Sequence, residues 1–247
     1  MRTAEKCGTV SGMKLHRFYA NNLHDKYGPV ELRQHIWISD PALYNQWARV
    51  LRYKVGDELI LFNGRGEDRL YKIHKIEENN VGLDLVTELE PVYPKQEVYL
   101  FFSLLKKDKN EWVLQKCTEL GVSHYVPILS ERTEKTGFSE ERAQKIVIEA
   151  AEQCGRSDIP SIREPLTLES ALQEFNGKVQ LYFAEQHSEP QSFAQSDLPK
   201  GVFVGPEGGW TDVEKELLHA NCNILNIAQF TLRAETACVA ATQQLLQ

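Results

Sequence analysis

The hydrophobic pattern of the chain changes near residue 97, which predicts two domains of different type. From residue 14 to about residue 90, apolar residues come in short runs or alternate with polar ones, as in "DELILFN" and "ENNVGLDLV". Short runs separated by glycine and asparagine turns predict strands, and one helix is expected at residues 41–52. Together these elements indicate a small β-barrel. The stretch "EPVYPKQE" then predicts a linker at residues 91–97.

Residues 98–247 alternate between strand-like and helix-like patterns. The run "VYLFFSLL" is almost continuously apolar, as is typical of a strand that is covered on both faces. The stretch "SEERAQKIVIEAAEQCG" predicts a helix that Ser139 caps and Gly155 ends. Further strands are expected in "HYVPIL", "VQLYFAE", "GVFVG" and "CNILNIA", and further helices in "KNEWVLQKCTELG", after Gly209 and from Ala234. This alternation predicts an α/β domain with a mostly parallel sheet.

Composition narrows the class of protein without indicating an activity. The 247 residues are 42% apolar and 26% charged, as in ordinary globular proteins. No stretch is long enough to span a membrane, and the N-terminus lacks an apolar signal core, so we expect a cytoplasmic protein with no membrane partner. The five cysteines and seven histidines show neither disulfide nor metal-ligand spacing, so we expect reduced thiols and no metal.

The net charge of -7 argues weakly against a nucleic-acid partner. The charge is unevenly distributed, because residues 14–95 carry 12 Lys and Arg and 12 Asp and Glu, whereas residues 96–247 carry 14 and 22. A polyanionic partner is therefore expected to meet local basic patches rather than the whole surface.

The stretch "GPEGG" at residues 205–209 follows a predicted strand, where ligands of α/β domains bind. Glycines there allow a ligand to approach the backbone closely. The turn lacks the spacing and the lysine of phosphate-binding loops, and Glu207 would repel a phosphate. Thr211 and Glu214 form a capping box that occupies the amides of the next helix. The pattern favours a neutral or cationic ligand; a tight turn that needs glycine only for its geometry is the alternative.

The last segment, "NILNIAQFTLRAETACVAATQQLL", predicts a strand, an irregular stretch and a helix. Small residues recur at helical spacing on this helix: Ala234, Ala237, Cys238 and Ala241. Such a face permits close approach of another element or another subunit, and an ordinary buried helix is the alternative. Arg233 lies just before the helix, where the helix dipole disfavours a cation. Its position therefore indicates an anionic partner, either Glu235 or a substrate phosphate.

Several motifs in this order carry a resemblance that covers nearly the whole chain. They are "HRFYA", "VLRYKVGDELILFNGRG", "KKDKNEWVLQKCTELGV", "PILSERT", "EQCGR" and the pair "GPEGG" and "TLRAETA". In this order and with this spacing they resemble the 16S ribosomal RNA uridine-N3 methyltransferases of the RsmE type. That family belongs to the SPOUT class of knotted methyltransferases.

The resemblance implies a PUA-like β-barrel at residues 14–90 and a SPOUT methyltransferase domain at residues 98–247 whose chain threads a trefoil knot. It also implies bound S-adenosylmethionine, a homodimer whose active sites draw on both subunits, and methylation at N3 of one uridine of 16S rRNA in the small ribosomal subunit. Residues 1–13 precede the usual start of the family. They are expected to form a disordered extension, or else the protein begins at Met13.

The resemblance further implies the residues of the site. The expected cofactor-binding residues are Gly205, Pro206, Glu207, Gly208, Gly209, Leu225, Ile227, Ala228, Leu232 and Ala234. The expected RNA-binding residues are Arg17, Lys106, Lys109, Lys116 and Arg132. Uridine N3 becomes a nucleophile only after it loses its proton, so positive charge at the uracil oxygens or the adjacent phosphate favours the reaction. We expect Arg156 and Arg233 to supply that charge, with a structural ion pair as the alternative for each.

Three residues depart from the family pattern "LG.RILR". Ala228 replaces glycine where close backbone approach is expected, Phe230 replaces an arginine that could contact RNA, and Thr231 replaces isoleucine. Two other functions stay open. One is a knotted methyltransferase that acts on tRNA or on a ribose 2′-OH, which the barrel and "EQCGR" disfavour. The other is a non-catalytic RNA-binding assembly factor, which the intact "GPEGG" and "LRAETA" disfavour.

Overall fold

The computed structural model describes residues 15–20, 24–25, 28–29, 32–133, 137–185 and 196–246. Contacts within the chain divide it into two compact units, Met1–Val92 and Tyr93–Gln247. The division falls within the segment 91–97 in which a linker is predicted. The expectation for residues 1–13 lies outside the described residues.

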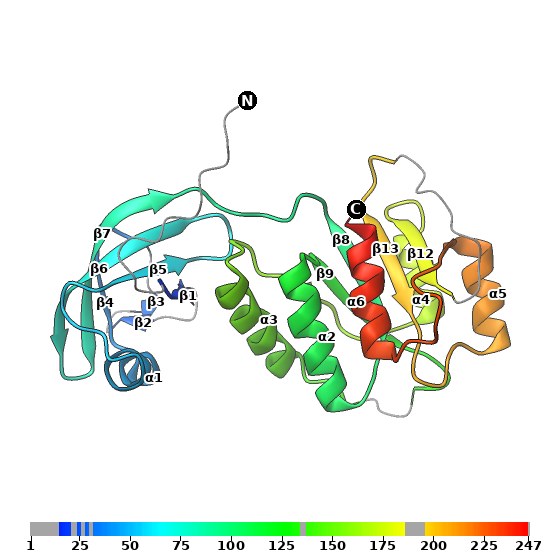
Figure 1. Ribbon diagram of the computed structural model, residues 1–247, viewed down its shortest axis with the longest axis horizontal. Coiled ribbons are helices and arrows are strands. Elements are labelled where there is room, and N and C mark those ends of the chain that lie inside the picture. The colour runs from blue at the N-terminus through cyan, green and yellow to red at the C-terminus, as the bar shows by residue number, and fades with distance from the viewer. Residues whose placement is uncertain are drawn as a thin grey trace. The chain divides into compact units, whose positions relative to one another are not determined.

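The first unit is built on a five-stranded sheet in the order β1-β5-β6-β7-β4 (Figure 1). Its strands are β1 Arg17–Tyr19, β4 His35–Ile38, β5 Glu58–Phe62, β6 Asp68–Glu77 and β7 Asn80–Leu89. The strands β2 His24–Asp25 and β3 Gly28–Pro29 form a separate antiparallel pair. All neighbours in the large sheet are antiparallel except β1 and β5, which run parallel.

The helix predicted at residues 41–52 is present as two segments that follow each other directly: the α-helix α1 Pro41–Tyr44 and the π-helix η2 Asn45–Val50. Asp40 caps it, because its carboxylate accepts hydrogen bonds from the backbone N–H groups of Ala42 and Leu43. The buried Trp47 of η2 packs into the core of the first unit. The predicted succession of short strands around one helix is thus confirmed.

The second unit holds a parallel sheet in the order β10-β9-β8-β13-β12-β14, with β11 also pairing with β9 (Figure 1). Its strands are β8 Val98–Ser103, β9 His124–Leu129, β10 Ser161–Ile162, β11 Leu166–Thr167, β12 Gln180–Ala184, β13 Lys200–Val204 and β14 Asn223–Leu225. Its helices are α2 Lys107–Leu120, α3 Glu140–Cys154, α4 Leu168–Phe175, α5 Asp212–Asn221 and α6 Ala234–Leu245. Each described pair of neighbouring strands is parallel, which confirms the predicted α/β class.

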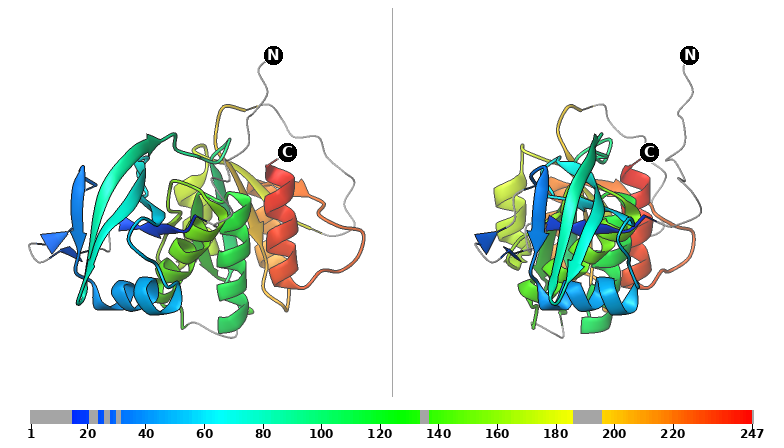
Figure 2. Two further views of the ribbon diagram at one scale, coloured as in Figure 1. Left: turned by 60° about the vertical axis from the view of Figure 1, so that its left-hand side comes forward. Right: turned by 90° about the vertical axis from the view of Figure 1, so that its left-hand side faces the viewer.

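Helices cover both faces of this sheet, as Figure 2 shows from two sides. One hydrophobic cluster joins α2, α3 and α6 to the sheet, and a second joins α4 and α5 to it. On β8, Leu100 and Phe102 belong to the first cluster, whereas Phe101 belongs to the second. Because successive residues of a strand point to opposite faces, two covered faces require the continuous apolar run seen in the sequence.

The predicted helix ends are confirmed. The Ser139 hydroxyl accepts from the N–H of Arg142 at the start of α3, and Gly155 ends that helix with φ 88°. The capping box of Thr211 and Glu214 opens α5. Helix α4 was not predicted, although Thr167 caps it and its buried residues recur at helical spacing: Leu168, Ala171, Leu172 and Phe175. The short strands β10 and β11 were also not predicted.

The small-residue face of α6 packs inside its own unit. Ala234, Cys238 and Ala241 are buried in the same cluster as α2 residues, and the Thr242 hydroxyl lies 3.6 Å from the thiol of Cys117 on α2. Burial raises the pKa of Cys117 to about 12, so this thiol stays protonated at neutral pH. The alternative of an ordinary buried helix therefore accounts for this face.

Candidate functional site

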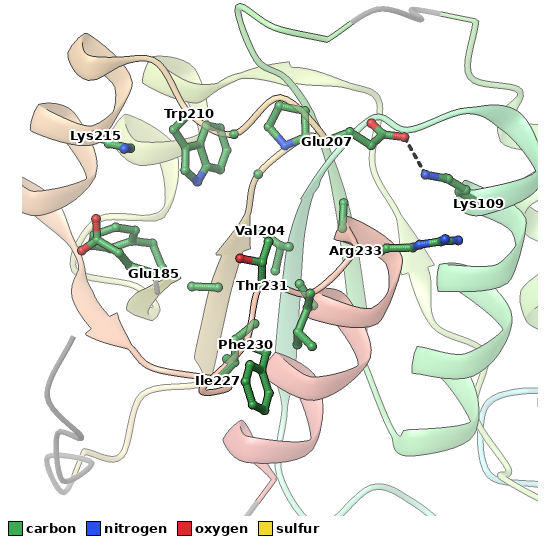
Figure 3. A pocket seen from close by; sticks show the side chains of 18 residues that line it. Lys109, Glu185, Val204, Glu207, Trp210, Lys215, Ile227, Phe230, Thr231 and Arg233 are labelled. Carbon is green, nitrogen blue, oxygen red and sulfur yellow. Dashed lines mark hydrogen bonds and ion pairs between the residues drawn. The ribbon is translucent and has the colours of Figure 1, made fainter. Parts of the chain in front are cut away.

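A cleft with a volume of about 650 Å³ opens at the carboxyl ends of β12 and β13 (Figure 3). One wall is the glycine turn after β13, which contributes Val204 to Glu207 and also Gly209. The opposite wall is the segment between β14 and α6, which contributes Ile227 and residues 230–234. Segments far apart in the chain therefore meet at the edge of the sheet where α/β domains bind ligands.

The glycine turn needs glycine for its own geometry at two positions. A side chain at Gly205 would bring its Cβ to 3.0 Å from Nε1 of Trp210, closer than ordinary packing allows. Gly209 has φ 68°, a left-handed conformation that other residues rarely adopt, and its N–H donates to the carbonyl of Pro206 over 2.9 Å. The turn also lines the cleft. Its geometry thus requires glycine, and the approach of a ligand to its backbone stays a prediction.

The segment after β9 holds the glycine turn in place. The Arg132 guanidinium donates from Nη1 to the carbonyl of Gly208 over 2.8 Å. The buried carboxylate of Glu214 accepts from the N–H of Glu131 and from the N–H of Thr211, each over 2.8 Å. Arg132 was expected to bind RNA, and the structure gives it a part in fixing the turn.

Lys109 on α2 joins the two walls of the cleft. Its ammonium lies 3.0 Å from Oε1 of Glu207 in the turn and 3.4 Å from Oε2 of Glu235 on α6 (Figure 3 draws the first contact). The hydrogen bond to Glu207 and the charge of Glu235 raise the pKa of Lys109, so it stays charged. The Glu207 carboxylate thus pairs with a lysine.

Arg233 has no such carboxylate partner among the residues that the structure describes. It lies at the N-terminus of α6, its side chain makes no capping hydrogen bond, and the residue is exposed. No ion pair of its guanidinium is found among the described residues, and Glu235 is paired with Lys109 instead. Of the two anionic partners considered from the sequence, Glu235 therefore forms no ion pair with Arg233 in the described part of the chain. Figure 3 shows Arg233 across the cleft from Glu185.

Arg156 has a different environment from Arg233. It is buried, with 5% of its surface exposed, and does not line the cleft. Its guanidinium donates to both carboxylate oxygens of Asp158, over 3.0 and 2.6 Å. It also donates to the carbonyls of Thr118 and Val122, over 3.0 and 2.8 Å. The structural ion pair that was the alternative for this residue is present.

The other expected site residues divide into those at the cleft and those away from it. Gly205, Pro206, Glu207, Gly209, Ile227, Leu232 and Ala234 line the cleft, whereas Gly208, Leu225 and Ala228 do not. Leu225 is buried and pairs with Ala184 in the sheet.

The other residues that were expected to bind RNA lie in different parts of the structure and make different contacts. Arg17 pairs with the buried Asp68 over 2.7 Å in the first unit. Lys116 pairs with Glu119, one turn away on α2, over 2.9 Å. Lys106 is exposed at the start of α2, and no ion pair involves it among the described residues.

The structure adds cleft residues that sequence reasoning missed, chiefly Glu185, Trp210 and Lys215. Glu185 directly follows β12, so the rule that ligands bind at carboxyl ends of strands could have found it. Trp210 is buried, and its indole N–H has no hydrogen-bond partner among the described residues. Phe230, flagged as a departure, lines the cleft with 73% of its surface exposed.

Two negative findings apply to the described part of the chain. No cluster of three or more His, Cys, Asp or Glu side chains there could hold a metal ion. No helix there is long and apolar enough to cross a membrane.

Comparison with known proteins identifies relatives of this chain. A model of the RNA methyltransferase domain matches residues 93–246, and a model of the RNA methyltransferase PUA domain matches residues 48–85. Ribosomal RNA small subunit methyltransferase E of Rickettsia conorii is 33% identical over 241 residues, which are 94% of this chain and 95% of that protein. The Bacillus subtilis protein of the same name is 30% identical over 207 residues, 76% of this chain and 80% of that protein.

Among solved structures, the Neisseria gonorrhoeae ribosomal RNA small subunit methyltransferase E bound to S-adenosylmethionine is similar, with a TM-score of 0.79 and 25% identity. The match covers 94% of this chain and 97% of that one. The fold, the matched domains and the identity over nearly the full length agree: the chain belongs to the family of ribosomal RNA small subunit methyltransferases E.

Proposed function

We propose that this protein transfers the methyl group of S-adenosylmethionine to N3 of a uridine in 16S rRNA. The observation that carries the proposal is the cleft between the glycine turn and residues 227–234, in a chain of this family. The relative from Neisseria gonorrhoeae, similar over 94% of this chain, was solved with the same cofactor bound. The choice of N3 rests on the resemblance of the motifs to the uridine-N3 enzymes.

The chemistry of the cleft fits this cofactor. A volume of about 650 Å³ is in the range of pockets for molecules of this size. Three cations and two carboxylates line it: Lys109, Lys215, Arg233, Glu185 and Glu207. Such a balance suits a ligand with positive and negative groups better than a triphosphate. When bound, S-adenosylmethionine supplies a methyl group on a sulfonium, whose positive charge the two carboxylates tolerate.

Arg233 is the cleft cation to which we assign the task of favouring loss of the uridine N3 proton. Negative charge spreads over the uracil oxygens as the proton leaves, and a guanidinium at the cleft stabilises it. Lys109 is less suited to this task because its ammonium is paired with Glu207 and Glu235. None of the described residues that line the cleft is a histidine, and the group that accepts the proton is not assigned. Because N3 lies on the Watson–Crick edge, the target uridine has to be unpaired or extruded.

The proposal includes a homodimer, a trefoil knot in residues 98–247, and a substrate that is 16S rRNA within the small ribosomal subunit. Such a substrate places the protein in the cytoplasm.

Lys106 stays a proposed RNA contact because it is exposed and without an ion pair among the described residues. Light scattering of the purified protein tests the dimer.

The decisive experiment compares nucleosides of 16S rRNA from cells with and without this protein. We expect 3-methyluridine to disappear from digested 16S rRNA when the gene is deleted and to return when purified protein and S-adenosylmethionine are added to isolated small subunits. Mass spectrometry separates 3-methyluridine from 2′-O-methyl nucleosides and from products in tRNA. Unchanged 3-methyluridine, with loss of another methylated nucleoside, contradicts the N3 assignment. A protein that binds RNA but gives no heat with S-adenosylmethionine, with or without RNA, is instead an assembly factor.

The glycine turn supplies a further prediction. Gly205→Ala places a methyl group 3.0–3.3 Å from the Trp210 indole, so the indole must move by a few tenths of an ångström. We expect the affinity for S-adenosylmethionine to fall by about tenfold, roughly 1.4 kcal/mol, because the turn and the displaced indole both line the cleft and lose their fit to the cofactor. Titration calorimetry with S-adenosylmethionine measures this affinity. Gly137→Ala is the matched control, because a Cβ there meets nothing within 4 Å. Equal affinities of the two variants would contradict the close fit of the turn.

A further inference from the structure

Phe230 exposes its ring at the cleft, unlike the other aromatic residues there. Among the residues that the structure describes, three aromatic side chains line the cleft: Phe183, Trp210 and Phe230. Phe183 and Trp210 are buried, whereas Phe230 is 73% exposed, more than any other large apolar residue in the described part of the chain. Single exposed apolar residues are common on protein surfaces, so it is the position at a ligand cleft that gives this one a meaning.

The fold does not use the Phe230 ring for packing. Phe230 lies between β14 and α6, outside helix and strand, and it belongs to neither hydrophobic cluster of the second unit. Two other residues of the lining, Ile227 and Ala237, do pack against one of these clusters. Figure 3 shows the Phe230 ring at the other end of the lining from Trp210 and Glu207. The ring is therefore available to a ligand that enters from solvent.

The exposure of Phe230 favours the RNA substrate over the cofactor as that ligand. A pocket normally covers most of the surface of a small ligand. The enclosed part of the cleft, beside the glycine turn and the buried Trp210, therefore suits the cofactor. The target base comes from a macromolecule and enters from outside, because it has to leave its place in the RNA to reach the methyl group. An exposed ring lies on the side from which this second ligand arrives.

Stacking is the contact that a phenyl ring offers to an extruded base. A base that leaves an RNA helix loses the stacking of its neighbours, and an aromatic side chain restores part of it. The phenyl ring covers only the face of the uracil, so the edge that carries O2, N3 and O4 stays accessible. Arg233, the cation assigned to the uracil oxygens, lines the same cleft and comes from the same segment of the chain. The face and the edge of one base can thus be bound by different side chains of this segment.

We propose that Phe230 is the stacking platform for the extruded target uridine: its ring lies against the face of the uracil and orients N3 towards the methyl group of S-adenosylmethionine. Phe230 binds and orients the base, whereas Arg233 stabilises its developing charge. The inference rests on the proposed function, since it assigns part of the cleft to the substrate of that reaction. It gives the cleft a task besides holding the cofactor, at one of the residues where this chain departs from the family pattern.

Methylation of small subunits from cells that lack this protein tests the platform. We expect Phe230→Leu, which stays apolar but loses the aromatic face, to raise KM by about tenfold, within the range for one lost base–aromatic stack. The rate at saturating subunits should stay within about twofold, because the stack is made before and during methyl transfer. Phe230→Tyr and Phe230→Trp keep a ring and should stay near the wild-type KM. Val213→Ala, which changes an exposed apolar residue on α5 away from the cleft, is the matched control.

Two further measurements distinguish stacking from other roles of the ring. The loss in Phe230→Leu should be the same at low and at high salt, because a phenyl ring carries no charge and releases no counterions from RNA. Lys106→Ala, by contrast, should make KM less dependent on salt. The affinity of each Phe230 variant for S-adenosylhomocysteine, measured by calorimetry without RNA, should match that of the wild type. Light scattering and thermal unfolding report the assembly and folding of each variant.

The outcomes separate this inference from the proposed function. A wild-type KM in Phe230→Leu, or equal losses in the Leu, Tyr and Trp variants, overturns the platform. A matching loss of S-adenosylhomocysteine affinity assigns the ring to the cofactor, and a changed oligomeric state assigns it to a contact between subunits; either result also overturns it. A wild type that methylates no small subunits contradicts the proposed function itself.

Discussion

Replacing Arg233 by alanine is expected to lower kcat for methylation of small-subunit rRNA by about 10²–10³-fold, the usual loss when one group that stabilises a developing anion is removed. The affinity for S-adenosylmethionine should change by less than about twofold, because losing an interaction made only in the transition state does not alter ground-state binding. The reason is structural: Arg233 is a cation of the cleft, it is exposed at the N-terminus of α6, and it lacks a carboxylate partner among the described residues. Single-turnover methylation and calorimetry measure the two effects.

The conservative variant and a control sharpen this test. Arg233→Lys keeps the charge and loses the planar fork, so an intermediate rate is expected. Arg163→Ala removes an exposed arginine that pairs with Glu174 over 2.8 Å and does not line the cleft, and it should behave as the wild type. Full activity in both Arg233 variants would remove the arginine from the mechanism.

Replacing Arg156 by alanine is expected instead to destabilise the protein, by about 3 kcal/mol, since removal of one partner of a buried ion pair leaves the other without compensation. The variant leaves Asp158 unpaired and takes a donor from the carbonyls of Thr118 and Val122. The Asp158 side chain is 24% exposed, so water solvates it in part and the loss of stability lies at the lower end of the range for buried ion pairs. Urea unfolding at constant pH measures the loss.

Arg156→Lys should also lose stability, because one ammonium cannot replace a bidentate contact and two bonds to carbonyls. Arg142→Ala is the matched control: its exposed pair with Glu111, at 2.8 Å, should contribute less than about 1 kcal/mol. A fully stable Arg156→Ala protein that no longer methylates RNA would contradict the structural role and assign Arg156 to the reaction.

Two of the motifs that resemble the family contact the glycine turn, which is itself the motif "GPEGG". Lys109 comes from "KKDKNEWVLQKCTELGV" and pairs with Glu207, and Arg132 comes from "PILSERT" and binds the carbonyl of Gly208. Both basic residues were expected to contact RNA. Their contacts show that at least part of their task is to hold the wall of the cleft, so substitutions at either should affect cofactor affinity as well as RNA affinity.

Local sequence patterns were sufficient to predict most of the strands and helices of the second unit. Continuous apolar runs predicted the buried parallel strands, and Ser139, Gly155 and the Thr211–Glu214 capping box predicted helix ends. These features depend on residues within one turn or one strand, so the sequence contains all their determinants. Helix α4 has the same kind of local signals, since the Thr167 cap and the helical spacing of its apolar residues are both present in the sequence.

The sequence by itself determined the two-unit organisation, the α/β class and the glycine turn, because these follow from hydrophobic period and backbone preference. Only the tertiary structure decided what each charged residue pairs with. Arg156 and Arg233 were equivalent candidates in the sequence, yet one is buried against Asp158 and the other is exposed at the cleft. Charge pairing depends on which side chains the fold brings within a few ångströms, and the partners of Lys109 lie about a hundred residues away in the chain.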